Sequence, residues 1–284
     1  MKFEFYTLWV DDNRPFVESI EMELKEWLDN KKGCELKVLL HRDELGVIED
    51  IATHDIDLIV IDYRLPRENG DVLIGKIRDS GCFQDIIFYS EGALPEKRFD
   101  GVFYVSKEDA KTRIKELTEL KLMRSSDLAT LRGWIVADAI ELEYMLDEIL
   151  MECFRPRHDI FAVEILNRTG TLDFSKKQQI INSLLTQELS RLVGIKDVTE
   201  RHKKLQRCKG IFKSFEAEII YYRNSVAHGK FETTPDGVKR LRKLGKKPDY
   251  FDFDENGIAQ GRKNLRKHRD CLIELRQLLI TPEE

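Results

Sequence analysis

The stretch LIVIDYRLPRENG, residues 58–70, decides the fold of the first part of the chain. A short apolar run ends in a carboxylate, Asp62, and the turn-forming Pro66 and Gly70 follow, which is typical of a buried strand and the loop after it. LWVDDN, residues 8–13, repeats the pattern, because Asp11 and Asp12 also follow an apolar run. Strands of a parallel sheet end at one edge, where ligands bind, so we expect these carboxylates to lie together.

The first 124 residues alternate short apolar runs with helical patterns. Helical spacing is clearest over 15–28 and 71–78, and the expected strands are 5–10, 36–40, 56–61, 85–89 and 101–105. This alternation predicts an α/β domain, a doubly wound five-stranded parallel sheet with helices on both faces. From residue 125 the pattern predicts helices only, in an up-and-down arrangement: Ser126 as a cap for 128–153, then 175–193, about 199–229 and 262–279.

Composition and charge fit two domains, 1–124 and 125–284. The chain has no signal-peptide pattern and no apolar run of about 18 residues, so we expect a cytoplasmic protein with no membrane partner. Five scattered cysteines predict reduced, mostly buried thiols. The first part has a net charge of −8 and the second +3, and residues 196–247 carry +9. That basic stretch is either a phosphate-binding surface or a solvated helix face.

Three carboxylates at one sheet edge repel one another, and a hard divalent cation with oxygen ligands relieves the repulsion. We therefore expect Mg²⁺ at Asp11, Asp12 and Asp62. Lys107, which ends FYVSK, and Ser90, which ends IIFYS, are polar residues at the ends of two further expected strands.

In these motifs and their order, residues 1–124 resemble the receiver (CheY-like) domain of two-component response regulators. The resemblance implies that Asp62 accepts a phosphoryl group and that a sensor histidine kinase or phosphotransfer protein is a partner. It also implies that Asp11, Asp12, Asp62 and the backbone carbonyl of Arg64 hold Mg²⁺.

The same resemblance implies that Lys107 pairs with the phosphoryl oxygens, that Ser90 hydrogen-bonds one of them, and that Tyr104 swings inward behind Ser90. Two residues depart from the family pattern: Glu108 follows Lys107 in place of proline, and Glu91 follows Ser90 in place of a small residue. The short segment between Ser90 and Lys107 predicts a reduced fourth helix. The alternative is a receiver fold kept as a dimerisation scaffold without phosphorylation.

YYRNSVAHGKF, residues 221–231, carries a second candidate site. At about 100° per residue, Asn224 and His228 share one helix face, whereas Arg223 and His228 diverge by roughly 140°. A two-fold dimer would place two such motifs opposite each other. The motif resembles the R-N-x-x-x-H form found in HEPN domains, and GTLDFSKKQQIINSLL, residues 170–185, is similar to the segment before it.

The HEPN resemblance implies a homodimeric, metal-independent endoribonuclease acting on RNA. His228 would act as general acid and base, Arg223 would stabilise the phosphorus-centred anion, and Asn224 would orient the histidine or the phosphate. In the structural alternative, His228 caps the helix end and Arg223 pairs with Glu218 or Glu216. The leading hypothesis is a response regulator with a HEPN ribonuclease effector, in defence or stress signalling by family analogy.

Two other functions remain open at this point. A non-enzymatic signalling adaptor would bind a partner protein or a nucleotide through the HEPN-like domain. A DNA-binding transcription factor is less well supported, because no short helix-turn-helix precedes a basic recognition helix.

Overall fold

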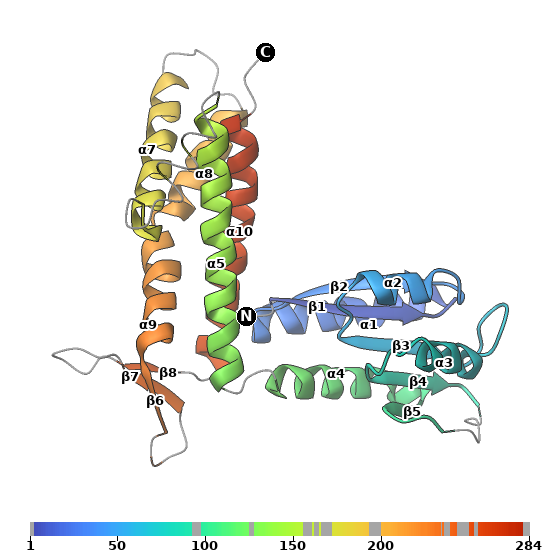
Figure 1. Ribbon diagram of the computed structural model, residues 1–284. Coiled ribbons are helices and arrows are strands. Elements are labelled where there is room, and N and C mark those ends of the chain that lie inside the picture. Colours follow the sequence, from blue (N-terminus) through green and yellow to red (C-terminus); the bar gives the residue numbers. More distant parts are fainter. Residues whose placement is uncertain are drawn as a thin grey trace. The chain divides into compact units, whose positions relative to one another are not determined.

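The structure is a computed structural model that describes residues 3–92, 98–124, 128–155, 161, 165, 172–192, 200–233, 235, 239–242, 250–252 and 255–280. Its contacts divide the chain into two compact units, Lys2–Asp127 and Leu128–Glu284, here called the N-terminal unit and the helical unit. Each unit has its own secondary structure and its own buried residues (Figure 1).

The N-terminal unit contains one five-stranded, all-parallel sheet (Figure 1). Its strands are β1 (Glu4–Val10), β2 (Glu35–His41), β3 (Leu58–Asp62), β4 (Ile86–Ser90) and β5 (Val102–Ser106). The order β2-β1-β3-β4-β5 is that of flavodoxin-like sheets. Its helical elements are α1 (Arg14–Trp27), the π-helical turn η1 (Leu28–Lys32), α2 (Val47–Thr53), α3 (Gly70–Asp79) and α4 (Lys107–Arg124). The prediction of a five-stranded parallel sheet is confirmed.

Alternating side chains of the strands build two cores, one on each face of the sheet. Phe5 and Trp9 of β1 pack with buried residues of α1 and α4, whereas Leu8 and Val10 pack with buried residues of α2 and α3. β3 is buried over its whole length, which explains why its sequence is continuously apolar up to Asp62. Helices therefore cover both faces, as the doubly wound prediction requires.

Two helix starts fix the side chains that matter for the site. Asn13 caps α1, because its side chain accepts a hydrogen bond from the Phe16 N–H. Ser106 accepts from the Asp109 N–H at 3.1 Å, and its hydroxyl donates to the Asp109 carboxylate at 2.7 Å. This reciprocal pair sets the first turn of α4 and places Lys107 at its beginning.

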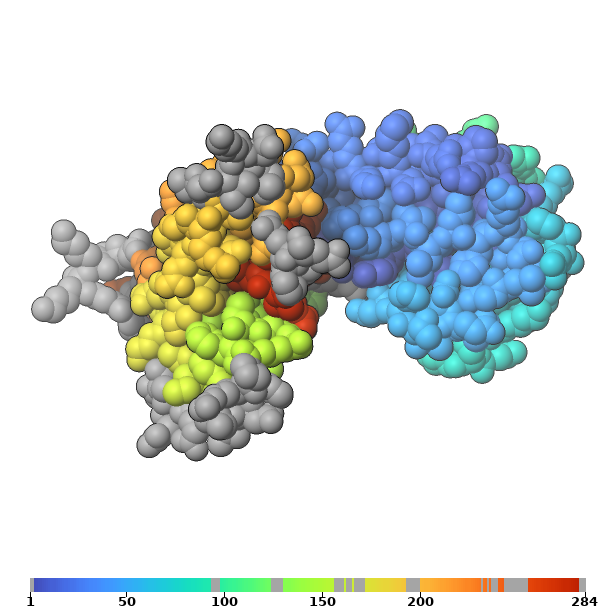
Figure 2. Space-filling view, turned by 90° about the horizontal axis from the view of Figure 1, so that it is seen from above, coloured from blue at the N-terminus to red at the C-terminus, as the bar shows by residue number. Residues whose placement is uncertain are grey.

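The helical unit packs four long helices in a closed ring, in the order α5–α10–α8–α7 (Figure 1). They are α5 (Leu128–Cys153), α7 (Phe174–Leu192), α8 (Glu200–Phe212) and α10 (Glu255–Ile280). Figure 2 shows the red α10 bordered by the green α5 in the space-filling view. The predicted apolar stripe of α5 is buried, including Leu131, Leu142 and Leu146. No helix among the described residues is long and apolar enough to span a membrane.

Two predictions for the helical unit are wrong. The single helix expected over about 199–229 is interrupted: after α8 come a turn at 213–214, a π-helical segment η3 (Glu216–Tyr221) and the short α9 (Tyr222–His228). The unit is also not all-helical, because β6 (Lys230–Thr233), β7 (Lys239–Arg242) and β8 (Tyr250–Asp252) form an antiparallel sheet. In this sheet, Phe231 of β6 and Leu241 of β7 are paired in register.

Two other expectations fall wholly or partly outside the described residues. The predicted Ser126 cap lies among residues 125–127. The reduced fourth helix falls partly on residues 93–97, and the described neighbours 91–92 and 98–101 form bends, turns and irregular chain up to the start of β5.

The thiol prediction is confirmed: all five cysteines are free, and all but Cys153 are buried.

Candidate functional site

Three aspartates meet at the carboxyl edge of the parallel sheet. Each of Asp11, Asp12 and Asp62 offers a carboxylate oxygen, and these oxygens lie within 4.8 Å of one another. Asp11 and Asp62 are buried, whereas Asp12 is exposed. The structure thus brings together the three residues that the sequence predicts, because β1 and β3 are adjacent and end at the same level. Oxygen ligands of this kind suit a hard divalent cation such as Mg²⁺.

Burial and the charge of a neighbouring aspartate raise the pKa of each of the two buried carboxyl groups. For Asp62, burial is the main cause, the charge of Asp11 adds to it, and the pKa rises to about 6 although Lys107 opposes the change. For Asp11, burial raises the pKa above its ordinary value, against hydrogen bonds from Tyr89 and from the Asn13 N–H. A bound cation would relieve both effects, so the residues present fit a divalent metal.

Tyr89 is part of this site, although the sequence reasoning did not include it. The Tyr89 hydroxyl donates a short hydrogen bond to Asp11 Oδ2, and it accepts one from Trp9 Nε1 at 3.1 Å. Asp11 Oδ1 accepts from the Asn13 N–H at 2.7 Å. Both carboxylate oxygens of Asp11 therefore accept a hydrogen bond from the protein. The available signal was a tyrosine directly after the apolar run Ile86–Phe88 of an expected strand, since a buried hydroxyl needs a partner.

Lys107 lies beside the acidic cluster with little freedom to move. Its side chain is only 14% exposed, and its Nζ lies 4.8 Å from the centre of the Phe16 ring and 5.8 Å from that of Tyr89. Its charge opposes the raised pKa of both Asp11 and Asp62. The Lys107 Nζ also lies 3.3 Å from a carboxylate oxygen of Glu91.

The loop after Asp62 is closed tightly at its two ends. Arg64 and Asn69 form an isolated antiparallel bridge, and the Gly70 N–H donates to the Tyr63 carbonyl at 2.8 Å. A Cβ on Gly70 would lie 2.3 Å from the Asp62 carbonyl oxygen, so only glycine allows this close approach. The metal-binding role of the Arg64 carbonyl stays a prediction.

Ser90 and Tyr104 differ in burial and in their hydrogen-bond partners. Ser90 is buried at the end of β4, and its Oγ accepts from the Gly92 N–H at 3.1 Å. Tyr104 is half-buried: its ring packs edge-on against Phe88, and its hydroxyl accepts from the Phe99 N–H at 2.9 Å. The switching roles of both residues stay predictions.

The second predicted site lies on α9 of the helical unit. Arg223 Nη1 donates to Asn224 Oδ1 at 2.8 Å, and both Asn224 and His228 are exposed. Because Arg223 and His228 belong to one regular α-helix, five residues separate them by about 140° around its axis. Arg223 and Asn224 are therefore joined by a hydrogen bond, and Asn224 and His228 share one face of α9, whereas Arg223 and His228 lie on different sides of it.

The ion pair considered for Arg223 is not found among the described residues. Glu218 instead accepts hydrogen bonds from Lys267, from His268 Nε2 at 2.7 Å and from Ser214 at 3.0 Å. The alternative in which Arg223 forms an ion pair with Glu218 or Glu216 is therefore wrong for the described residues.

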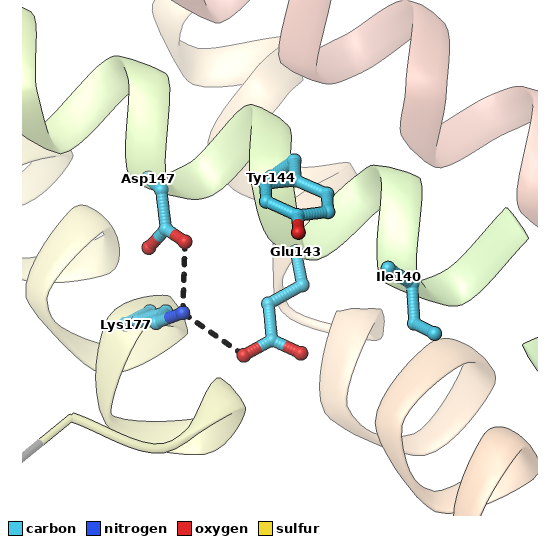
Figure 3. Close-up of a pocket in the computed structure, with 5 residues that line it drawn as sticks. All are labelled: Ile140, Glu143, Tyr144, Asp147 and Lys177. Atoms are coloured by element: carbon cyan, nitrogen blue, oxygen red, sulfur yellow. Dashed lines mark hydrogen bonds and ion pairs between the residues drawn. The ribbon is translucent and has the colours of Figure 1, made fainter. Parts of the chain in front are cut away.

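A third polar cluster joins α7 to α5 and is shown in Figure 3. The buried Lys177 donates to Glu143 Oε1 and Asp147 Oδ2, both at 2.9 Å. Burial alone would lower the pKa of Lys177, but the two hydrogen bonds outweigh burial and raise it, so the amine stays charged. The adjoining pocket, also lined by Ile140 and Tyr144, holds about 230 Å³, below the usual range for ligand sites. The observed contacts of the cluster link α7 to α5.

No protein-family model and no curated protein matches the chain. Several solved receiver domains resemble part of it. The Francisella response regulator 1452 receiver domain is 20% identical over 42% of this chain and 98% of its own, with a TM-score of 0.35. The signal receiver domain of the putative response regulator NarL from Mycobacterium tuberculosis is 16% identical over 42% and 97%, with a TM-score of 0.34. A CheY-like receiver domain protein from Methanospirillum hungatei is 19% identical over 42% and 98%, with a TM-score of 0.32. The functional assignment therefore rests on the acidic cluster.

Proposed function

We propose that the N-terminal unit is the phosphoacceptor domain of a response regulator and that Asp62 is the acceptor. The observation that carries this proposal is the meeting of Asp11, Asp12 and Asp62 at one sheet edge, with Lys107 beside them. A merely structural role does not account for two adjacent buried carboxyl groups whose pKa values are both raised, mainly by burial.

Asp11, Asp12 and Asp62 are the side chains that would hold Mg²⁺, together with the Arg64 carbonyl. When bound, Mg²⁺ supplies positive charge that makes an anionic phosphodonor acceptable next to three carboxylates. Tyr89 and the Asn13 N–H hold Asp11 in a fixed orientation. Lys107, kept in place by Phe16 and Tyr89, is positioned to neutralise the charge of the incoming phosphoryl oxygens.

In the transfer itself, an Asp62 carboxylate oxygen forms a bond to phosphorus as the bond between phosphorus and the donor's leaving atom breaks. The leaving group departs with the electron pair, so no oxidant or reductant is needed. Ser90 is buried at the same edge, and its hydroxyl proton is available to donate while its Oγ accepts from Gly92. A sensor histidine kinase or a phosphotransfer protein is the proposed donor.

Intact-protein mass spectrometry tests the proposal. The full chain is incubated with Mg²⁺ and acetyl phosphate, and the modified residue is located after reduction of the acyl phosphate with borohydride. We expect one phosphoryl group on the wild type and none on Asp62→Asn or after EDTA treatment. An unmodified wild type under these conditions, or modification at another residue, would refute the assignment.

For the helical unit we propose a HEPN-type, metal-independent endoribonuclease that works as a homodimer. The exposed His228 and Asn224 and the hydrogen-bonded Arg223 favour this proposal, because no carboxylate neutralises the arginine among the described residues. One His228 would take the proton of the RNA 2′-hydroxyl, which attacks the adjacent phosphorus. The partner subunit's His228 would protonate the leaving 5′-oxygen, and a cyclic phosphate would result.

The test compares the wild type with His228→Ala on a mixed RNA pool in EDTA. His202→Ala is the matched control, since His202 lies on α8 of the same unit and bonds to Gln206 rather than to the motif. We expect cleavage by the wild type and the control only. No cleavage by any variant, with or without prior phosphorylation, would favour the adaptor function, in which this unit binds a partner protein or a nucleotide.

A further inference from the structure

The residue after Ser90 contacts the one side chain that the proposed reaction needs for charge neutralisation. Glu91 Oε1 lies 3.3 Å from Lys107 Nζ, which is an ion pair. The two partners differ in mobility: the Glu91 side chain is 64% exposed, whereas that of Lys107 is 14% exposed and packed over two aromatic rings. Glu91 is therefore the partner that can move away.

The ion pair between Glu91 and Lys107 lies at the sheet edge that carries the three aspartates, so it changes the charge that a phosphodonor meets there. Asp11, Asp12 and Asp62 contribute three carboxylates, and Lys107 is the cation whose charge opposes the raised pKa of the two buried ones. Glu91 adds a fourth carboxylate and offsets the charge of Lys107. An anionic phosphodonor must therefore approach against this extra negative charge and compete for the lysine.

We propose that Glu91 is an intramolecular competitor of the phosphoryl group for Lys107 and so slows phosphorylation of Asp62. This inference rests on the proposed function of the N-terminal unit. In the unphosphorylated protein Glu91 holds the ammonium group. A phosphoryl group on Asp62 carries more negative charge than a carboxylate, takes over Lys107 and repels Glu91 into solvent.

The position of Glu91 in the chain links its release from Lys107 to the backbone that follows β4. Glu91 directly follows β4 and lies between Ser90 and Gly92, whose N–H donates to the Ser90 hydroxyl. Release of Glu91 therefore frees the first residues of the β4–β5 connection at the moment when Ser90 donates to the phosphoryl group. Glu91 acts through Lys107 and is a positioning residue.

The test measures the initial rate of Asp62 phosphorylation in the full chain with Mg²⁺ and acetyl phosphate, where the new bond joins Asp62 to phosphorus and acetate leaves. Glu91→Gln keeps the size of the side chain and removes its charge. Glu108→Gln is the matched control, because Glu108 is exposed and lies next to Lys107 in the chain, on the first turn of α4.

We expect Glu91→Gln to be phosphorylated about three to ten times faster than the wild type in about 0.1 M salt. The gain should shrink in about 1 M salt, where the Debye length is about 3 Å, because the effect is electrostatic. Glu108→Gln should stay within about twofold of the wild type.

Equal rates for Glu91→Gln and the wild type would overturn the inference and leave phosphorylation of Asp62 standing. Equal acceleration in both Gln variants would also overturn it, since general surface charge would then explain the change. If neither the wild type nor Glu91→Gln is modified at Asp62, the proposed function fails together with the inference.

Discussion

Replacing Asp62 by asparagine should stabilise the metal-free protein. The buried carboxylate lies next to Asp11, and the two negative charges disfavour the folded state unless a cation is bound. Asparagine has nearly the same shape and keeps an acceptor oxygen. It removes the charge whose burial and repulsion raise the pKa of Asp62 from 3.8 to about 6.

The size and sign of the effect follow from that pKa. A raised pKa means that the folded protein binds the proton more tightly than the unfolded chain does, so the wild type loses stability as the pH rises from about 4 to about 6. At about 1.4 kcal/mol per pKa unit, Asp62→Asn should increase the free energy of unfolding by up to about 3 kcal/mol at neutral pH. The gain should disappear below about pH 4, where the wild-type carboxyl is protonated in both states.

The assay is urea unfolding followed by tryptophan fluorescence, at several pH values and with EDTA or Mg²⁺. A Trp134→Phe background restricts the signal to Trp9 and Trp27 of the N-terminal unit, because the chain has three tryptophans. Asp12→Asn is the matched control, since Asp12 belongs to the same cluster but is exposed to water. Its effect on the free energy of unfolding should be below about 1 kcal/mol.

Mg²⁺ should reduce or reverse the stability difference between the wild type and Asp62→Asn. The ion stabilises the wild type by mass action and binds Asp62→Asn more weakly, so the difference in unfolding free energy shrinks or changes sign. The reasoning is refuted if Asp62→Asn is no more stable than the wild type at neutral pH in EDTA, or if the gain is the same at acidic pH.

Three further outcomes follow from the packing and hydrogen bonds. Tyr89→Phe removes the bonds to Asp11 and Trp9 and should lower the free energy of unfolding by about 1–3 kcal/mol; urea unfolding measures it, and an unchanged transition midpoint would contradict it. Gly229→Ala places a Cβ 2.6 Å from Leu241 Cγ and should lower the free energy of unfolding by about 1–3 kcal/mol. Gly210→Ala, in open space on α8, should raise the free energy of unfolding by up to about 1 kcal/mol. Thermal unfolding should therefore show the two midpoints moving in opposite directions. Lys177→Met leaves Glu143 and Asp147 without their cation and should lower the free energy of unfolding by about 3–5 kcal/mol. Lys176→Met, at an exposed neighbouring position, is the control and should have a much smaller effect. Similar circular-dichroism melting curves for both variants would count against a structural role of Lys177.

The helical unit shows where sequence reasoning failed. Residues 199–229 have one apolar stripe, and the stripe could not reveal the turn at 213–214, because the buried residues on both sides continue to face the same core. The strands β6 to β8 are short, and each pairs only with its neighbours in the sheet. Strands of three or four residues are too short to show a clear alternation of apolar and polar residues, so the sequence pattern predicted only helices from residue 125.

At the site in the N-terminal unit, some contacts could be predicted from the sequence and others could not. Apolar runs that end in carboxylates were sufficient to predict the parallel sheet and the meeting of Asp11, Asp12 and Asp62, because strand period and strand ends are local properties of the sequence. Only the tertiary structure decided that Tyr89 holds Asp11 and that Glu91 pairs with Lys107. Those contacts depend on the rotamers and burial of residues from different elements, which no local pattern specifies.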